Sequence, residues 1–251
     1  MSSARHFMFL FAIMLIVVTA PCTAWADGTP HWVNYKWLLP NPTLPKKVLI
    51  LYSDIEVVEV TAGGVEETVP KWSNVASRTV LKALKTALKK HGLKESTVPK
   101  YPGTSTNNLD EHEALYKLVV VTASETGWRN KIRHFDYSIG PGLRKITAKT
   151  GVNYAFMVFG RDYVSTTGRK ARAIAGNIPI VNIFTGPPPK LGHSFIHLGL
   201  IDLRTGDLLW MNSDYREGTT NLRDPDDAKK MLNTLFYWYP GIESYRKAYV
   251  N

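Results

Sequence analysis

The sequence predicts an α/β fold, an α+β sandwich in which helices pack on a mixed, mainly antiparallel β-sheet. Short apolar runs typical of buried strands begin at Lys47 and recur as far as Met211. One long amphipathic helical pattern lies between these runs, and a helix with clear capping residues lies near the C-terminus. Residues 47–251 are therefore expected to form one domain, which is long enough to bury a core without disulfides.

The first 26 residues have the three parts of a secretory signal peptide. Arg5 precedes an uncharged apolar run over Phe7–Val18, and Ala24-Trp25-Ala26 supplies small residues for cleavage before Asp27. The run is shorter than the roughly 20 residues of a membrane span, which favours cleavage over an uncleaved anchor. We therefore expect export to the periplasm.

Lipidation is the alternative route for this segment. Cys22 is the only cysteine and stands where a lipoprotein signal places its acylated residue. Pro21 directly before it disfavours processing, because the proline ring fixes φ and removes the N–H. Cleavage after Ala26 would discard Cys22, whereas lipidation would make the chain an outer-membrane lipoprotein.

Residues 27–46 are predicted to be a tether. Four prolines in this stretch oppose regular structure. Trp32 and Trp37 within it are candidate contacts for a protein partner, since aromatic anchors dominate many interfaces. The alternative is that these aromatic side chains pack back on the domain.

The domain begins with strand patterns. Val48–Tyr52 is typical of a buried strand, and Glu56–Val60 and Val65–Val69 flank a Gly63-Gly64 turn as in a hairpin. The next pattern is the clearest helix of the chain, with Ser73 or Asn74 as its cap. Its apolar stripe consists of Val80, Ala83, Leu84, Ala87 and Leu88, and Gly92 ends it.

The middle of the chain contains two further helical patterns and one strong strand. Asp110 to about Ala123 is a helical candidate, although Val119–Val121 is a β-branched run that prefers strands. Leu143–Thr150 is a predicted short helix, and Tyr154–Phe159 a predicted strand that ends at Gly160.

An apolar segment without charge covers Ala173–Phe184 and is followed by a Gly-Pro-Pro-Pro run. It forms either a pair of edge strands or a loop that contacts a partner or a membrane. In the second case Ile178, Ile183 and Phe184 are the candidate contact residues.

The C-terminal part has a clear strand–turn–strand pattern. Asp202–Gly206 makes a tight turn between two apolar strands. Asp224 or Asp226 then caps a last helix, with Pro225 in its first turn.

The chain is basic, with 31 Lys and Arg against 21 Asp and Glu. Since export excludes most cytoplasmic partners, we expect anionic lipid or polymer rather than nucleic acid to be attracted by this charge. A solvated basic surface is the simpler interpretation. The candidate anion contacts are Lys82, Lys85, Lys89, Arg129, Lys131 and Arg133.

No motif predicts a catalytic, cofactor or metal site. His193 and His197 flank a predicted strand, where four residues separate them by roughly 13 Å, too far for one metal ion. The acidic turn Asp202–Asp207 lacks the spacing of a calcium loop. No Gly-x-Ser-x-Gly element or phosphate-binding loop occurs.

Leu200–Trp210 resembles the strand–turn–strand that closes a group of bacterial envelope proteins. The helix Val75–His91 and the strand entry Gly151–Phe156 are similar to the same group. This group shares the fold of the TolB amino-terminal domain, the curli secretion lipoprotein and the lipoprotein activators of peptidoglycan synthases. Asn221–Pro225 with its helix further resembles an uncharacterised proteobacterial family of exported proteins and lipoproteins. The resemblance implies a fold and brings no catalytic residues.

Three hypotheses about function follow. The first is a non-enzymatic protein of the periplasm or outer membrane that binds a protein partner in envelope assembly or maintenance. The second is binding of anionic envelope lipid or polymer, such as lipopolysaccharide or phospholipid, through the basic surface. The third is a hydrolase without a recognisable motif, which a pocket with clustered carboxylates or histidines would support.

Overall fold

The structure is a computed structural model, and it describes residues 31–34, 37, 44–96, 106–125, 135–168, 170–171, 192–218 and 220–240. The predicted signal peptide lies outside these residues. So do seven of the candidate residues named above: Cys22, Arg129, Lys131, Arg133, Ile178, Ile183 and Phe184.

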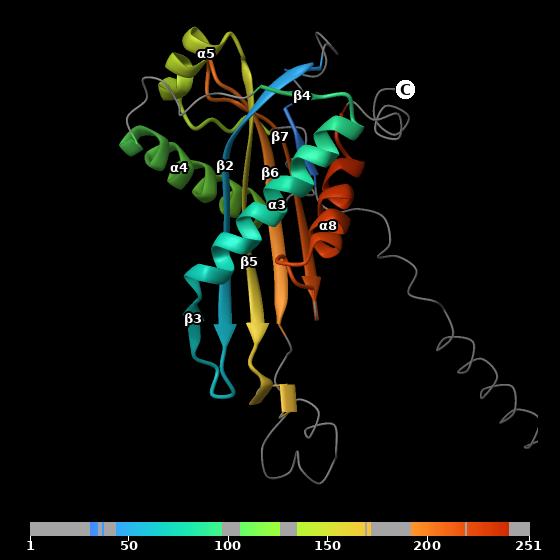
Figure 1. The fold of residues 1–251 in the computed structure, drawn as a ribbon. Coiled ribbons are helices and arrows are strands. Elements are labelled where there is room, and N and C mark those ends of the chain that lie inside the picture. Colours follow the sequence, from blue (N-terminus) through green and yellow to red (C-terminus); the bar gives the residue numbers. More distant parts are fainter. Residues whose placement is uncertain are drawn as a thin grey trace, which may run out of the picture.

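One seven-stranded sheet organises the described part of the chain (Figure 1). Its strands are β1 (His31–Val33), β2 (Lys47–Val60), β3 (Glu66–Thr68), β4 (Lys94–Glu95), β5 (Tyr154–Ser165), β6 (His193–Asp202) and β7 (Leu208–Glu217). They are ordered β1-β7-β6-β5-β2-β3, with β4 also on β2. The pairs β2–β5 and β2–β4 are parallel and the others are antiparallel. This confirms the predicted mixed, mainly antiparallel sheet.

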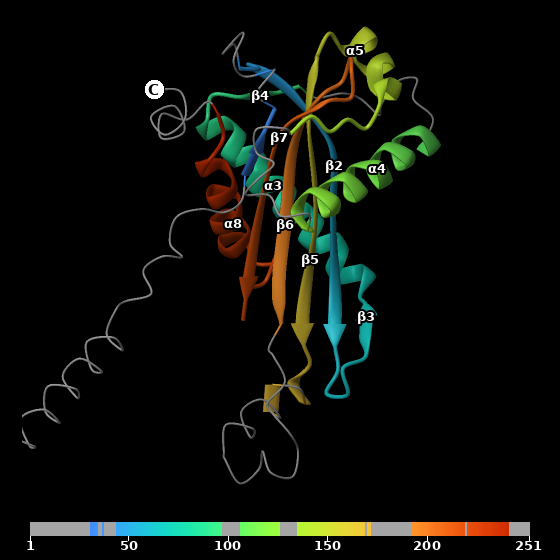
Figure 2. The same ribbon diagram turned by 180° about the vertical axis from the view of Figure 1, so that it is seen from behind.

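Helices cover both faces of the sheet, which gives three layers. They are α3 (Pro70–Lys90), α4 (Thr106–Glu125), the 3-10 turn η4 (Pro141–Leu143), α5 (Arg144–Thr150) and α8 (Pro225–Tyr237). The pair α3 and α8 lies on one face, and α4 lies on the other (Figures 1 and 2). The predicted α/β sandwich is therefore confirmed.

Each face of the sheet has its own apolar core. Under α3 and α8, Phe156 and Trp210 pack with Phe236 of α8, and all three are fully buried. On the opposite face, Tyr116 and Val120 of α4 pack with Met157 and its neighbours. Successive residues of β5 alternate between the two cores, as the period of two of a strand requires.

β1 lies inside the range predicted to be a tether. It pairs antiparallel with β7, so that Trp32 lies opposite Met211. The side chain of Trp32 is only 2% exposed and belongs to the core beneath α4. Residues 31–33 thus pack back on the domain, which is the alternative to a tether. This corrects the assignment of Trp32 as a surface contact.

α3 begins earlier than the sequence predicts, at Pro70 instead of after Ser73 or Asn74. Proline at the first helical position needs no N–H partner, so it starts the helix without a side-chain cap. The hydroxyl of Ser73 is used otherwise. It accepts the backbone N–H of Val57 at 2.9 Å and donates to the carbonyl of Val69 at 3.1 Å, which holds the helix against β2.

β5 does not end at Gly160 but continues to Ser165. A Cβ at Gly160 would lie 2.3 Å from the carbonyl oxygen of Phe195, so glycine here permits close approach of β6. β2 likewise is one strand of 14 residues where the sequence predicts two runs. The hairpin into β3 is confirmed, with Val58 opposite Thr68.

The C-terminal elements follow the prediction. Asp202 and Asp207 close the turn between β6 and β7, with the N–H of Asp202 bonded to the carbonyl of Asp207 at 3.0 Å. The carboxylate of Asp224 accepts the N–H groups of Asp226 and Asp227 at 2.8 and 3.2 Å, which caps α8. Pro225 occupies the first turn.

Candidate functional site

α4 is apolar on both sides. Its inner side contributes the buried Tyr116, while Leu115, Leu118 and Val121 on its outer side are 44%, 63% and 41% exposed. Single exposed leucines are normal on a protein surface, but three at intervals of three residues form a continuous stripe. We call these three residues the α4 outer stripe. No element of the described chain covers this stripe, which makes it a candidate contact surface.

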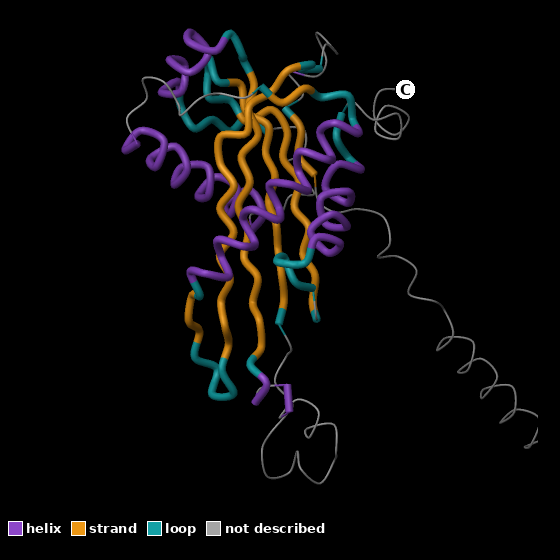
Figure 3. The backbone as a smooth tube through the Cα atoms, viewed as in Figure 1, coloured by secondary structure: helices purple, strands orange, loops and turns teal. Residues whose placement is uncertain are grey.

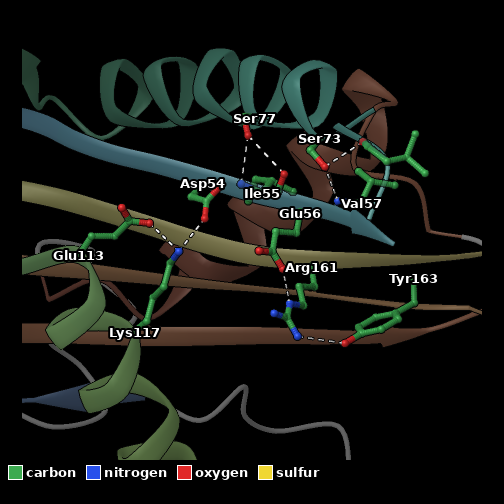
Figure 4. A network of polar contacts seen from close by, with 11 residues as sticks. Asp54, Ile55, Glu56, Val57, Ser73, Ser77, Glu113, Lys117, Arg161 and Tyr163 are labelled. Carbon is green, nitrogen blue, oxygen red and sulfur yellow. Dashed lines mark hydrogen bonds and ion pairs between the residues drawn. The ribbon is translucent and has the colours of Figure 1, made fainter. Parts of the chain in front are cut away.

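The helix is held firmly on the sheet. Gly199 of β6 leaves room for the ring of Tyr116, whose hydroxyl donates to the carbonyl of Met157 at 3.0 Å. Lys117 of the same helix contacts Asp54 of β2 at 2.6 Å and Glu113 at 2.5 Å (Figure 4). α4 therefore presents its outer stripe from a fixed position.

Next to α4 the same face of the sheet has no described helix over it. Figure 2, which looks at this face, shows β2, β5 and β6 running on beyond α4. Figure 3, viewed from the α3 side, shows the same long strands extending past the helices. We call this part the open sheet face. By strand register its side chains form three rows across β2, β5, β6 and β7: Asp54–Phe159–His197–Ser213, Glu56–Arg161–Phe195–Tyr215 and Val58–Tyr163–His193–Glu217.

Six of these twelve side chains are aromatic rings. Tyr163 and His193 stack at 4.2 Å between centroids with 20° between their planes, and Phe159 and His197 stack at 4.8 Å and 25°. The two rings of each pair thus turn their flat faces to one another, and Phe159 is itself buried.

Ion pairs border the rings. The Nε atom of Arg161 donates to Glu56 at 2.6 Å, and its Nη1 donates to the hydroxyl of Tyr163 at 3.4 Å (Figure 4). Lys117 and Arg161, the basic residues of this network, are thus each paired with carboxylates. Three carboxylates, of Asp54, Glu56 and Glu113, thus share two basic groups in this network. Asp110 and Glu111 are exposed in the first turns of α4.

His197 and Ser213 on neighbouring strands are in hydrogen-bond contact through Nδ1 and Oγ. A serine and a histidine in contact are the first two members of a hydrolytic triad, so this pair tests the third hypothesis. Burial lowers the pKa of His197 to about 4, so the imidazole is a weak base at neutral pH. No carboxylate of the described residues is hydrogen-bonded to this imidazole, and the geometry therefore does not favour nucleophilic catalysis.

Within the described ranges, no group of three or more His, Cys, Asp and Glu residues is placed to hold a metal ion. None of the described helices is long and apolar enough to cross a membrane.

The residues predicted from sequence are scattered over the fold. Trp37 is half-buried and packs against the core under α3 and α8, on the side away from α4. Lys82, Lys85 and Lys89 are exposed on α3. The structure does not bring any of them together with the α4 outer stripe.

The α4 outer stripe is not among the sites that the sequence predicts. The run Val119–Val121 counts against a helix by its β-branching, yet it also signals a helix with apolar residues on every side. The open sheet face has no signal of its own in the sequence. Alternation along β5 and β6 shows which residues share a face and does not show which face remains uncovered.

No protein-family model matches the chain, and no curated protein is significantly similar to it in sequence. Solved structures with a similar arrangement include the PelC dodecamer from Paraburkholderia phytofirmans, 9% identical over 76% of this chain and 86% of that chain, with a TM-score of 0.33. A leucine-to-methionine variant of the same PelC dodecamer is 10% identical over the same shares, with a TM-score of 0.36.

The LpoB C-terminal domain from Salmonella enterica is 12% identical over 73% of this chain and 91% of that chain, with a TM-score of 0.27. LpoB is a peptidoglycan-synthase activator lipoprotein, one of the groups that the sequence motifs resemble. The resemblance to the TolB domain and to the curli secretion lipoprotein stays a prediction.

Proposed function

We propose that this chain is an exported protein of the bacterial envelope that acts by binding a protein partner and catalyses no reaction. The signal pattern of residues 1–26 supports the compartment. The contact surface is the α4 outer stripe together with the open sheet face beside it. The exposure of Leu115, Leu118 and Val121 on a rigidly held helix is the observation that carries the proposal.

The α4 outer stripe offers enough apolar side chain to support an interface. Burying one exposed leucine or valine completely contributes about 1.5–3 kcal/mol. Three such side chains, with the exposed Tyr215 on the same face of the sheet, can form the centre of an interface whose central residues dominate the affinity. The slight excess of carboxylates over basic groups around Lys117 and the exposed Asp110 and Glu111 of α4 favour a partner with basic residues around an apolar centre.

Site-specific photo-cross-linking in the native envelope tests the proposal. A photoreactive residue at Leu118 or Val121 is expected to give one and the same protein adduct, while the same residue at Thr86, exposed on α3, gives none. The partner, once identified by mass spectrometry, is then purified for binding measurements.

Leu118→Asp should weaken the measured affinity at least about tenfold, since it removes a buried contact and places a charge in the interface. The matched control is Val75→Asp, an exposed aliphatic residue of the opposite helical layer. Equal affinity for wild type and Leu118→Asp, or equal adducts at Thr86 and Leu118, would contradict the proposal.

A further inference from the structure

α3 is the most strongly charged element of the described chain. Six of its 21 residues are basic, and none is Asp or Glu. The six are Lys71, Arg78, Lys82, Lys85, Lys89 and Lys90. Like charges four residues apart, as at Arg78 and Lys82 or Lys85 and Lys89, destabilise a helix slightly. The composition therefore calls for an explanation that lies outside the helix.

The charges form a line along the helix. Lys71, Val75, Arg78, Lys82, Lys85 and Lys89 follow one another at alternating intervals of four and three residues. At about 1.5 Å rise per residue the line is roughly 27 Å long. All but Val75 are basic, and we call this set the α3 basic line. The buried residues of α3, from Ala76 to Leu88, lie on the opposite side of the helix.

Little of this charge is neutralised within the described chain. Lys85 contacts Glu95 of β4 at 2.8 Å. For Arg78, Lys82 and Lys89 no ion pair occurs with any described residue. The neighbouring helix α8 does not compensate, because its Asp227 is engaged with Lys230 at 3.5 Å and with the N–H of Asn221.

We infer that the α3 basic line is a binding surface for a bilayer of anionic phospholipid. A straight line of flexible basic side chains, of which only Lys85 is in an ion pair with a described residue, suits a plane of phosphate groups, whereas a small anion needs converging donors. Val75, 38% exposed on the same line, can enter the headgroup region. Each basic residue near an anionic bilayer raises the partition coefficient of the protein by a factor of roughly five, so four of them together raise it several hundredfold.

This inference goes beyond the proposed function and does not depend on it. α3 and α4 lie on opposite faces of the sheet (Figures 1 and 2). A bilayer on the α3 side leaves the α4 outer stripe accessible. Lipid and partner protein can therefore be bound at the same time, and each interaction can be lost without the other.

Vesicle flotation with the purified protein tests the inference. Vesicles of phosphatidylcholine alone are compared with vesicles that contain about 30% phosphatidylglycerol, a composition with a negative surface potential. We expect binding to the anionic vesicles only, falling steeply as salt rises from about 50 to 300 mM, because the contacts are screened. The variant K82E/K89E should bind at least about tenfold less.

The matched control is K145E/K149E, which makes the same change of charge at two exposed lysines of α5. Circular dichroism confirms that both variants are folded. If the two variants lose binding equally, net charge and not the α3 basic line is responsible, and the inference is overturned. Binding to neutral vesicles of the same strength, or tighter salt-dependent binding to duplex DNA than to anionic vesicles, overturns it as well.

Discussion

His197 makes the stability of the fold depend on pH in a way that can be worked out from the structure. Its ring stacks on Phe159 and its Nδ1 contacts Ser213, in the row of the open sheet face nearest to α4. Burial lowers its pKa from 6.5 to about 4, because the charged imidazolium loses hydration there. The folded protein therefore binds this proton less readily than the unfolded chain does.

The direction of the effect follows from linkage. A pKa that is lower in the folded state contributes stability above the unfolded pKa of 6.5, and this stability is lost as pH falls towards about 4. At pH 5 the unfolded chain already binds the proton and the folded protein largely does not. The loss at that pH is about 2 kcal/mol, and it approaches about 3 kcal/mol below pH 4.

His197→Gln removes the titrating group and keeps a polar side chain that can bond Ser213. Urea unfolding of both proteins at about pH 7.5 and pH 5 gives the free energy of unfolding in each state. The wild type is expected to lose about 2 kcal/mol more than the variant between the two values. All other ionisable groups are common to both proteins, so their contributions cancel in this difference. An equal loss in wild type and variant would refute the assigned environment of His197.

Three further changes test the packing. Gly199→Ala places a Cβ 2.7 Å from the ring of Tyr116 and should cost about 1–3 kcal/mol in urea unfolding while displacing α4; unchanged stability would show that α4 is free to shift. Asp224→Ala removes the cap of α8 and should lower stability by about 1 kcal/mol, seen as a lower thermal midpoint. Burial raises the pKa of Asp162, so its ionisation lowers the free energy of unfolding as pH rises through that pKa. The free energy of unfolding of Asp162→Asn, relative to that of the wild type, should therefore increase between about pH 3 and pH 7. A constant difference between the two proteins would contradict this.

The fold is predictable where local patterns and tertiary packing agree. The hairpin after β2 follows from its Gly-Gly turn, and the cap of α8 follows from Asp224 before Pro225. The predictions are wrong where a long-range contact decides. β5 does not end at Gly160, because this glycine instead lets β6 approach closely. Ser73 does not cap α3, because its hydroxyl accepts a hydrogen bond from β2.

The candidate site is less predictable than the fold. Periodicity shows which side of a helix is apolar. That Leu118 belongs to a second, exposed apolar side becomes evident only in the structure, where the sheet is seen to bury the other side. The stacked rings of β5 and β6 are far apart in sequence and meet only through strand register. The α3 basic line is visible from sequence in part, since the spacing of Lys82, Lys85 and Lys89 already places them off the apolar stripe.

The pairing of β1 with β7 also limits how far the domain can move from any attachment at its amino-terminal side. If Cys22 were acylated, only nine peptide units would separate the lipid from His31, which is fixed at the sheet edge. Fully extended, this segment would span about 30 Å. A lipidated form would thus keep His31 within about 30 Å of its membrane, whereas a form cleaved after Ala26 could diffuse across the whole periplasm.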